Sequence, residues 1–160
     1  MPERPLIGTG VVVLKDGDAG PLVLLVKRAK PPRQGQWSLP GGRQELGETI
    51  RETARREVRE ETGVEIADLR LLDVIDSITP DPAAPAGPPV FHYTLIDFSA
   101  RWASGDPRAG DDAAEAIWAD TARLADYDLW DETARLIGVT CQRARSAPHG
   151  DTPENSRKSP

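Results

Sequence analysis

Residues 42–64 of the chain read GRQELGETIRETARREVREETGV. Within this stretch, Thr49–Thr62 contains strong helix formers and neither proline nor glycine, which is typical of a helix. Thr49 and Glu52 have the spacing of a capping box, and Gly63 is placed where a glycine ends a helix. We therefore expect a well-capped helix over residues 49–62.

Three glutamates gather on one edge of this expected helix. On a wheel of about 100° per residue, Glu57, Glu60 and Glu61 fall within about 100° of arc. They lie near the helix C-terminus, where the helix dipole disfavours negative charge and like charges four residues apart repel. A solvated acidic face is the ordinary interpretation of neighbouring glutamates. Here the electrostatic cost of placing them at this end of the helix favours a bound cation. Carboxylate oxygens without His or Cys suit Mg²⁺, with Mn²⁺ as a substitute, and such ions are often shared with substrate phosphates.

Composition and charge narrow the class of protein. The 160 residues carry a net charge of −6 and 38% hydrophobic residues, which fits one soluble domain. The acidic balance argues against binding to a nucleic acid polymer, and the longest apolar runs fall far short of the roughly 20 residues of a membrane span. The single cysteine, Cys141, excludes an internal disulfide framework and suits a reducing compartment. We expect a cytoplasmic protein that binds neither nucleic acid polymers nor membranes.

The rest of the chain predicts strands around this helix and a second helix near the end. Apolar, β-branched and aromatic runs predict the strands. The expected strands are residues 6–14, 22–26, 64–78, 90–102 and 113–118. The first two would form a hairpin with a longer, turn-rich loop over residues 15–20, and five prolines make residues 80–89 a loop. Residues 132–145 predict the last helix. We expect a domain over residues 1–145 and, because large apolar side chains are absent there, a disordered tail over residues 146–160.

The spacing of residues 42–64 resembles the Nudix box. That family's pattern is Gly, five residues, Glu, seven residues, then Arg-Glu-aliphatic-any-Glu-Glu-any-Gly-aliphatic. Every specified position is met, by Gly42, Glu48, Arg56, Glu57, Val58, Glu60, Glu61, Gly63 and Val64. The seven strictly specified letters would coincide by chance about once in 10⁹ starting positions. The resemblance implies an α/β fold, an α/β/α sandwich around a mixed β-sheet.

The resemblance also implies an activity and a set of site residues. Family members hydrolyse a nucleoside diphosphate linked to another group, with water attacking a phosphorus of the pyrophosphate. Carried over by position, the metal ligands would be Glu57, Glu60, Glu61 and the carbonyl of Gly41. Arg56 would hold the glutamates in place through a salt bridge, and Glu48 would take a supporting role, either electrostatic or in the shell of the metal.

The general base and the substrate contacts lie outside the box in much of this family. The corresponding segment here is residues 110–118, where Glu115 is the first candidate for the base and Asp112 the second, beside Asp111. Asp112 is also a candidate for contact with the substrate. Arg28, at the end of an expected strand, is a candidate for contact with a phosphate, although a strand-end arginine is ordinarily solvated.

Two further segments, VFHYTLIDF over residues 90–98 and AGDDAAEAIW over residues 109–118, resemble a bacterial branch described as ADP-ribose pyrophosphatase-like. The resemblance implies a small nucleotide substrate, ADP-ribose or a related ADP-sugar, cleaved to AMP and a sugar phosphate. One alternative is a nucleoside triphosphate pyrophosphohydrolase that cleans the nucleotide pool. Another is a nucleotide-binding sensor without turnover. Many relatives form homodimers, so a homodimer is a further expectation.

Overall fold

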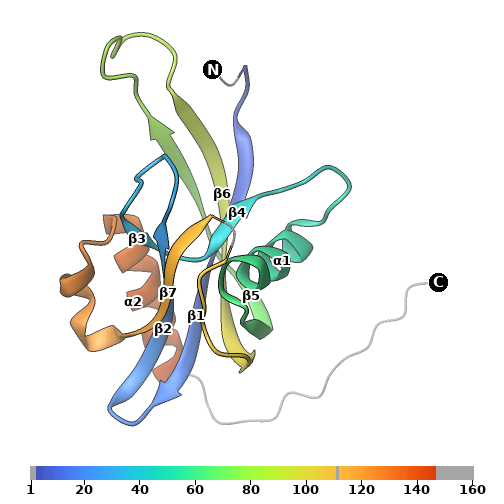
Figure 1. Cartoon of the computed structure of the whole chain (residues 1–160), viewed down its shortest axis with the longest axis vertical. Coiled ribbons are helices and arrows are strands. Elements are labelled where there is room, and N and C mark those ends of the chain that lie inside the picture. Colours follow the sequence, from blue (N-terminus) through green and yellow to red (C-terminus); the bar gives the residue numbers. More distant parts are fainter. Residues whose placement is uncertain (1–2, 111, 147–160) are drawn as a thin grey trace.

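A mixed β-sheet runs through the middle of the molecule (Figure 1). The computed structural model describes residues 3–110 and 112–146, and within them the sheet has seven strands. The strands are β1 (Leu6–Gly17), β2 (Gly20–Arg28), β3 (Trp37–Ser38), β4 (Gly41–Arg43), β5 (Glu65–Thr79), β6 (Phe91–Ser104) and β7 (Ala113–Asp120). Their order is β3-β2-β1-β6-β5, with β4 paired to β1 and β7 paired to β2. β1 and β6 are parallel, and the other pairs are antiparallel.

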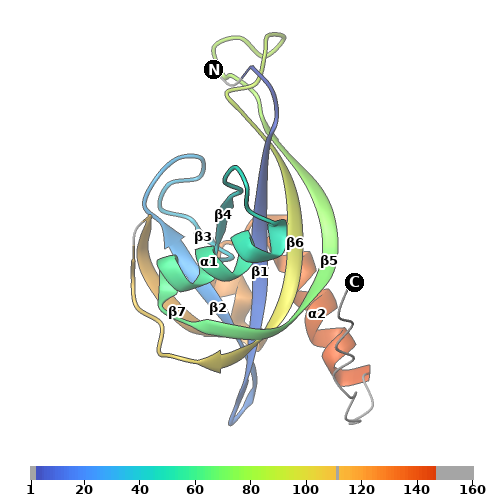
Figure 2. The same ribbon diagram turned by 90° about the vertical axis from the view of Figure 1, so that its right-hand side faces the viewer.

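Two helices cover opposite faces of this sheet, as Figure 2 shows together with Figure 1. They are α1 (Ile50–Thr62) and α2 (Asp131–Ser146), and a short 3-10 helix, η1 (Thr121–Tyr127), precedes α2. Alternate residues of β1 serve the two faces: Val11 packs into the core under α1, whereas Val12 packs into the core under α2. Because side chains alternate along a strand, one buried strand supplies both cores. The expected α/β/α sandwich around a mixed sheet is confirmed.

The ends of α1 follow the expected capping. The Thr49 hydroxyl accepts from the backbone N–H of Glu52 at 3.2 Å, and the Glu52 carboxylate accepts from the backbone N–H of Thr49 at 2.7 Å. At the other end, Gly63 has φ 74° and donates its N–H to the Arg59 carbonyl. This left-handed conformation favours glycine. Both boundaries of the helix that carries the three glutamates were therefore predictable from single residues.

The prediction of a longer loop over residues 15–20 is wrong. Lys15 pairs with Leu22 and Gly17 pairs with Gly20, so the strands continue through the charged residues and the turn is much tighter. The polar residues predicted a longer loop from local turn preference. Pairing between the strands is a long-range effect, and here it outweighs that preference. The sequence did not predict η1, because its residues form a short 3-10 segment without a long apolar period.

The other expected strands and the last helix lie where the sequence predicted them, within a few residues. Within the described residues, neither helix is long and apolar enough to span a membrane. Cys141 is buried in α2. The expected tail, residues 146–160, lies outside the described residues apart from Ser146, which ends α2.

Candidate active site

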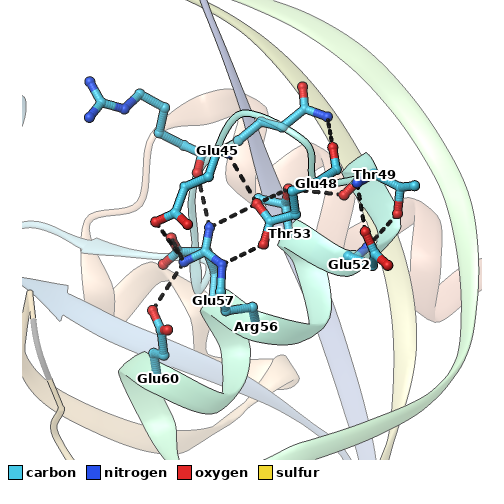
Figure 3. Close-up of polar contacts among 10 residues, drawn as sticks. Glu45, Glu48, Thr49, Glu52, Thr53, Arg56, Glu57 and Glu60 are labelled. Carbon is cyan, nitrogen blue, oxygen red and sulfur yellow. Dashed lines mark hydrogen bonds and ion pairs between the residues drawn. The ribbon is translucent and has the colours of Figure 1, made fainter.

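Arg56 lies at the centre of a network of ion pairs on α1 (Figure 3). Its guanidinium contacts Glu48 through Nε at 2.5 Å and Nη2 at 3.0 Å, and its Nη1 contacts Glu57 at 2.8 Å and Glu60 at 3.1 Å. The hydrogen bonds from Arg56 lower the pKa of Glu48 to about 2. A planar, forked guanidinium can hold several carboxylates at once. Arg56 thus brings together three of the acidic residues that the sequence singled out.

Glu57 lies directly against β4. A side chain at Gly42 would overlap the Glu57 carboxylate, so the glycine at this position permits the close approach of helix and strand. Burial raises the pKa of Glu57, and the bonds from Arg56 act in the opposite direction. The carboxylate is therefore held in a half-buried place where a cation would lower its electrostatic cost.

Glu61 is the most deeply buried of the three glutamates. Burial raises its pKa to about 8, and the hydrogen bond from Gly41 acts in the opposite direction. The Gly41 N–H donates to Glu61 Oε2 at 3.1 Å. The contact between Gly41 and this carboxylate therefore runs through the N–H, and the ligand role expected for the Gly41 carbonyl stays a prediction.

The donor set suits a hard divalent cation. Glu57, Glu60 and Glu61 project from successive turns of one helix and offer carboxylate oxygens, two of them at the cost of burial. Oxygen donors of this kind are the ligands that Mg²⁺ prefers. As the side chains are arranged in the described part of the chain, no three acidic, His or Cys residues converge into a ready-made metal cluster. Arg56 holds two of the three carboxylates by hydrogen bonds.

The glutamates open into a cavity of about 500 Å³, a volume within the usual range for small-molecule sites. Basic side chains from the end of β2 and the segment after it also line the cavity: Arg28, Lys30 and Arg33. The positive charge of Arg28 lowers the pKa of Glu61, which places Arg28 near the carboxylates. The Arg33 guanidinium lies 4.1 Å from the centre of the Trp130 ring. Basic groups opposite acidic groups in one cavity can bind a phosphate chain together with metal ions.

The candidates for the general base fall in different places. Asp112 lines the cavity, contacts Lys30 Nζ at 2.5 Å, and raises the pKa of Glu57 and Glu61 by its charge. Glu115, on β7, lies 4.0 Å from Lys27 Nζ, is about half exposed and does not line this cavity. Asp111 lies outside the described residues. The structure thus brings Asp112, and not Glu115, close to the glutamates.

Arg33, Asp97 and Trp130 also line the cavity, and the sequence alone did not predict them as site residues. Asp97 is 3% exposed on β6, and its Oδ1 accepts the Gly10 N–H at 2.7 Å. A carboxyl in an otherwise apolar strand was the signal that could have found it. Trp130 follows the unpredicted η1, and Arg33 follows a proline-rich turn. Whether their side chains face the cavity therefore depends on loop geometry, which the sequence did not predict.

The family model of the NUDIX domain matches residues 4–137 of this chain. The chain belongs to the NUDIX family. Among relatives, it is 36% identical over 121 residues to the ADP-ribose pyrophosphatase of Methanocaldococcus jannaschii, covering 76% of this chain and 65% of that protein. It is also 38% identical to the putative 8-oxo-dGTP diphosphatase 2 of Mycobacterium tuberculosis, covering 68% of this chain and 72% of that protein.

Solved structures agree on the fold. The NUDIX domain of Shewanella oneidensis NrtR, complexed with ADP ribose, matches with a TM-score of 0.74 at 21% identity, covering 89% of this chain and 90% of that chain. The MutT NUDIX hydrolase of Burkholderia pseudomallei matches with a TM-score of 0.70 at 29% identity, covering 85% and 98%. Hydrolases of the NUDIX family act on phosphoric anhydrides and generally need a divalent metal. The chain spans slightly less than two thirds of the length of the Methanocaldococcus protein.

Proposed function

We propose that this protein hydrolyses the pyrophosphate bond of ADP-ribose or a related ADP-sugar, giving AMP and a sugar phosphate. The observation that carries the proposal is the complete box, whose three carboxylates share one cavity with Arg28 and Arg33. A cavity of about 500 Å³ has room for more than a phosphate chain. The Methanocaldococcus relative is named as an ADP-ribose pyrophosphatase, which supports ADP-ribose as the substrate.

Mg²⁺ is the proposed cofactor, and Mn²⁺ its substitute. Glu57, Glu60 and Glu61 would hold the metal, with the Gly41 carbonyl as a further ligand. A bound divalent metal would offset the negative charge of the phosphates and lower the pKa of a water molecule. Arg56 positions the glutamates, with Glu48 as its support.

Around the metal, the remaining roles fall to residues of the cavity wall. Arg28 and Arg33 bind the phosphates of the substrate through charge-assisted hydrogen bonds. Asp112 is the first candidate for the general base, because it lines the cavity and its charge acts on Glu57 and Glu61. Glu115 is the second candidate, through the position that the family resemblance gives it.

A second candidate function is cleavage of a nucleoside triphosphate to the monophosphate and pyrophosphate. It is favoured by the 38% identity to the Mycobacterium relative, which is named as a putative 8-oxo-dGTP diphosphatase. The same carboxylates and the same metal would serve this reaction. The two functions differ in which substrate is held and which products leave.

Product analysis separates them. The purified protein is incubated with Mg²⁺ and, in parallel, with ADP-ribose, ADP-glucose and a set of nucleoside triphosphates that includes 8-oxo-dGTP. The proposal expects AMP together with ribose 5-phosphate from ADP-ribose. Release of pyrophosphate from triphosphates alone would move the assignment to the second function. Binding of nucleotides without turnover, with Mn²⁺ as well as Mg²⁺, would favour a sensor.

Three further proposals concern the whole protein. We propose that residues 1–145 form the catalytic domain, that the protein acts in the cytoplasm, and that it forms a homodimer. The family match over residues 4–137 supports the extent of the catalytic domain. A single buried cysteine, Cys141, is compatible with the reducing conditions of the cytoplasm. Sedimentation of the purified protein measures the third directly.

A further inference from the structure

Part of the cavity lies on the face of the sheet that α2 covers, where the proposed reaction uses no residue. The strands β5 and β6 place Ser77 opposite Tyr93 and Asp73 opposite Asp97 in register. The residues that line this part are Gly8, Gly10, Ser77, Leu95, Asp97 and Thr133. Leu95 belongs to the core under α2. This region therefore forms a recess between the sheet and α2, continuous with the glutamate-lined cavity.

Two glycines keep the floor of this recess open. A Cβ atom at Gly10 would lie 2.9 Å from Asp97 Oδ1, and one at Gly8 would lie 3.2 Å from a methyl carbon of Leu95. Both distances are shorter than ordinary van der Waals contact. The absence of side chains at these positions of β1 thus leaves room for the Asp97 carboxyl and for a ligand above the strand.

Asp97 carries a carboxyl group in this apolar setting at a cost to folding. It is 3% exposed, between Ile96 and Phe98, and burial of a carboxylate is expensive without compensation. Arg135, the basic group whose charge acts on Asp97, is bonded instead to Asp73 at 2.7 Å and to Glu132 at 2.7 Å. The hydrogen bond from Gly10 engages Oδ1, and that bond alone could be served by a neutral side chain. A buried acid kept in a binding cavity is therefore a candidate for ligand recognition.

The surroundings of Asp97 suit a flat ring that carries an amino group. Tyr93, Leu95, Trp130 and Leu136 give the cavity apolar and aromatic walls, against which a nucleobase packs favourably. A carboxylate accepts a hydrogen bond from an amino group, whereas a carbonyl oxygen in the same place would be repelled.

We propose that Asp97 determines base specificity by accepting a hydrogen bond from the exocyclic amino group of the substrate's nucleobase. The proposal rests on the proposed function, because it assigns the recess to the nucleoside part of that substrate. Adenine and guanine both carry such an amino group, and hypoxanthine does not. The recess therefore favours amino-bearing purines over hypoxanthine, whichever of the two is the physiological base.

Binding of reaction products tests the proposal without turnover. Isothermal titration calorimetry with AMP, GMP and IMP, in the presence of Mg²⁺, gives three dissociation constants for the wild-type protein. Measurement at about pH 8.5 keeps Asp97 ionised, because burial raises its pKa to about 7. Since a hydrogen bond to a charged group discriminates strongly, we expect AMP, GMP or both to bind at least about tenfold more tightly than IMP.

The variant Asp97→Asn sharpens this test. Its amide oxygen replaces the carboxylate oxygen as acceptor of the Gly10 N–H, which turns the amide NH₂ group toward the ligand. The preference should therefore reverse, with IMP binding at least as tightly as the amino-bearing nucleotide. Asp73→Asn is the matched control, because it removes the same charge from the paired position of β5 without altering a cavity-lining residue. It should keep the wild-type preference, and thermal melting verifies that both variants are folded.

The outcomes separate this proposal from the proposed function. Equal binding of AMP, GMP and IMP to the wild type, absence of binding of all three, or an Asp97→Asn variant with unchanged preference would each overturn the role of Asp97. Preference for GMP alone would uphold that role and contradict adenine as the base. Preference for AMP without hydrolysis of ADP-ribose would uphold the role of Asp97 and contradict the proposed reaction.

Discussion

At the scale of single residues, Arg56 shows how one side chain can organise a site. Its guanidinium contacts Glu48, Glu57 and Glu60 at once, and all of these contacts use the planar fork of arginine. Lysine would keep the positive charge but could not make the same set of bonds. The arrangement of the glutamates should therefore depend on the shape of Arg56 as well as on its charge.

The conservative variant Arg56→Lys tests this dependence. We expect kcat/KM to fall about 10–100-fold, which is the usual cost of losing a group that orients metal ligands. Steady-state kinetics with the product assay measures the loss, and Arg55→Lys is the matched control because Arg55 is an exposed neighbour on the same helix. Activity of Arg56→Lys within twofold of the wild type would contradict the positioning role.

The general base is a second question at this scale. Asp112 lines the cavity, and Glu115 does not. We expect Asp112→Asn to lower kcat by about 10²–10⁴-fold, as removal of a general base does, and Glu115→Gln to change it little. Comparison of kcat for the two variants decides between the candidates. A large loss in Glu115→Gln with intact turnover in Asp112→Asn would restore the order that the family resemblance implies.

At the scale of elements, the packing of α1 against β4 depends on Gly42. An added methyl group there would overlap the end of the Glu57 side chain and not the backbone. Because the end of a flexible side chain can move aside, we expect Gly42→Ala to fold with nearly unchanged melting temperature. Its activity should nevertheless fall by more than about 10-fold, because Glu57 is displaced from its place beside Glu61.

Thermal melting and the product assay on Gly42→Ala measure the two effects separately. Gly138→Ala is a suitable control, since a methyl group at Gly138 in α2 would meet open space. A Gly42→Ala variant with wild-type kinetics would contradict the close contact between β4 and Glu57. A variant that fails to fold would contradict the ease with which the Glu57 side chain is expected to move.

The extent to which the sequence predicted these elements follows from the range of the forces involved. The α1 boundaries rest on local bonds, those of Thr49 with Glu52 and of Gly63 with Arg59, and local residues predicted them. Asp97 and Asp112 enter the cavity through strand register and through the irregular pairing at Arg28. Those pairings join residues far apart in the chain, so the sequence indicated Asp112 only through the family resemblance and did not place Asp97 at the site.

At the scale of the whole molecule, buried acids make stability depend on pH. Burial, together with smaller effects of Asp73 and Glu132, raises the pKa of Asp97 to about 7 against the opposing effects of the Gly10 N–H and Arg135. The folded state therefore binds more protons than the unfolded chain between about pH 4 and 7. The contribution of Asp97 to the free energy of unfolding should thus decrease as pH rises through this window.

Urea denaturation of wild type and Asp97→Asn at several pH values measures this contribution. The free energy of unfolding of the wild type minus that of the variant should increase by about 2 kcal/mol as the pH is lowered from about 8 to about 5. Taking the difference between the two proteins removes the titration of Glu61 and Glu48, which they share. A difference that is constant with pH would show that Asp97 titrates normally and is not desolvated.

In the proposed function, Glu57, Glu60 and Glu61 of α1 support hydrolysis of a phosphoric anhydride together with a divalent metal. The most direct measurement is the rate of AMP release from ADP-ribose with Mg²⁺ in wild type, Glu61→Gln and Glu52→Gln. Glu52→Gln is the control, because glutamine can keep the capping-box bond to Thr49 at the start of the same helix. We predict that Glu61→Gln lowers the rate more than about 100-fold, which is a larger loss than removal of a group that only orients a metal ligand causes. Glu52→Gln should retain the wild-type rate. Wild-type turnover in Glu61→Gln would contradict the account.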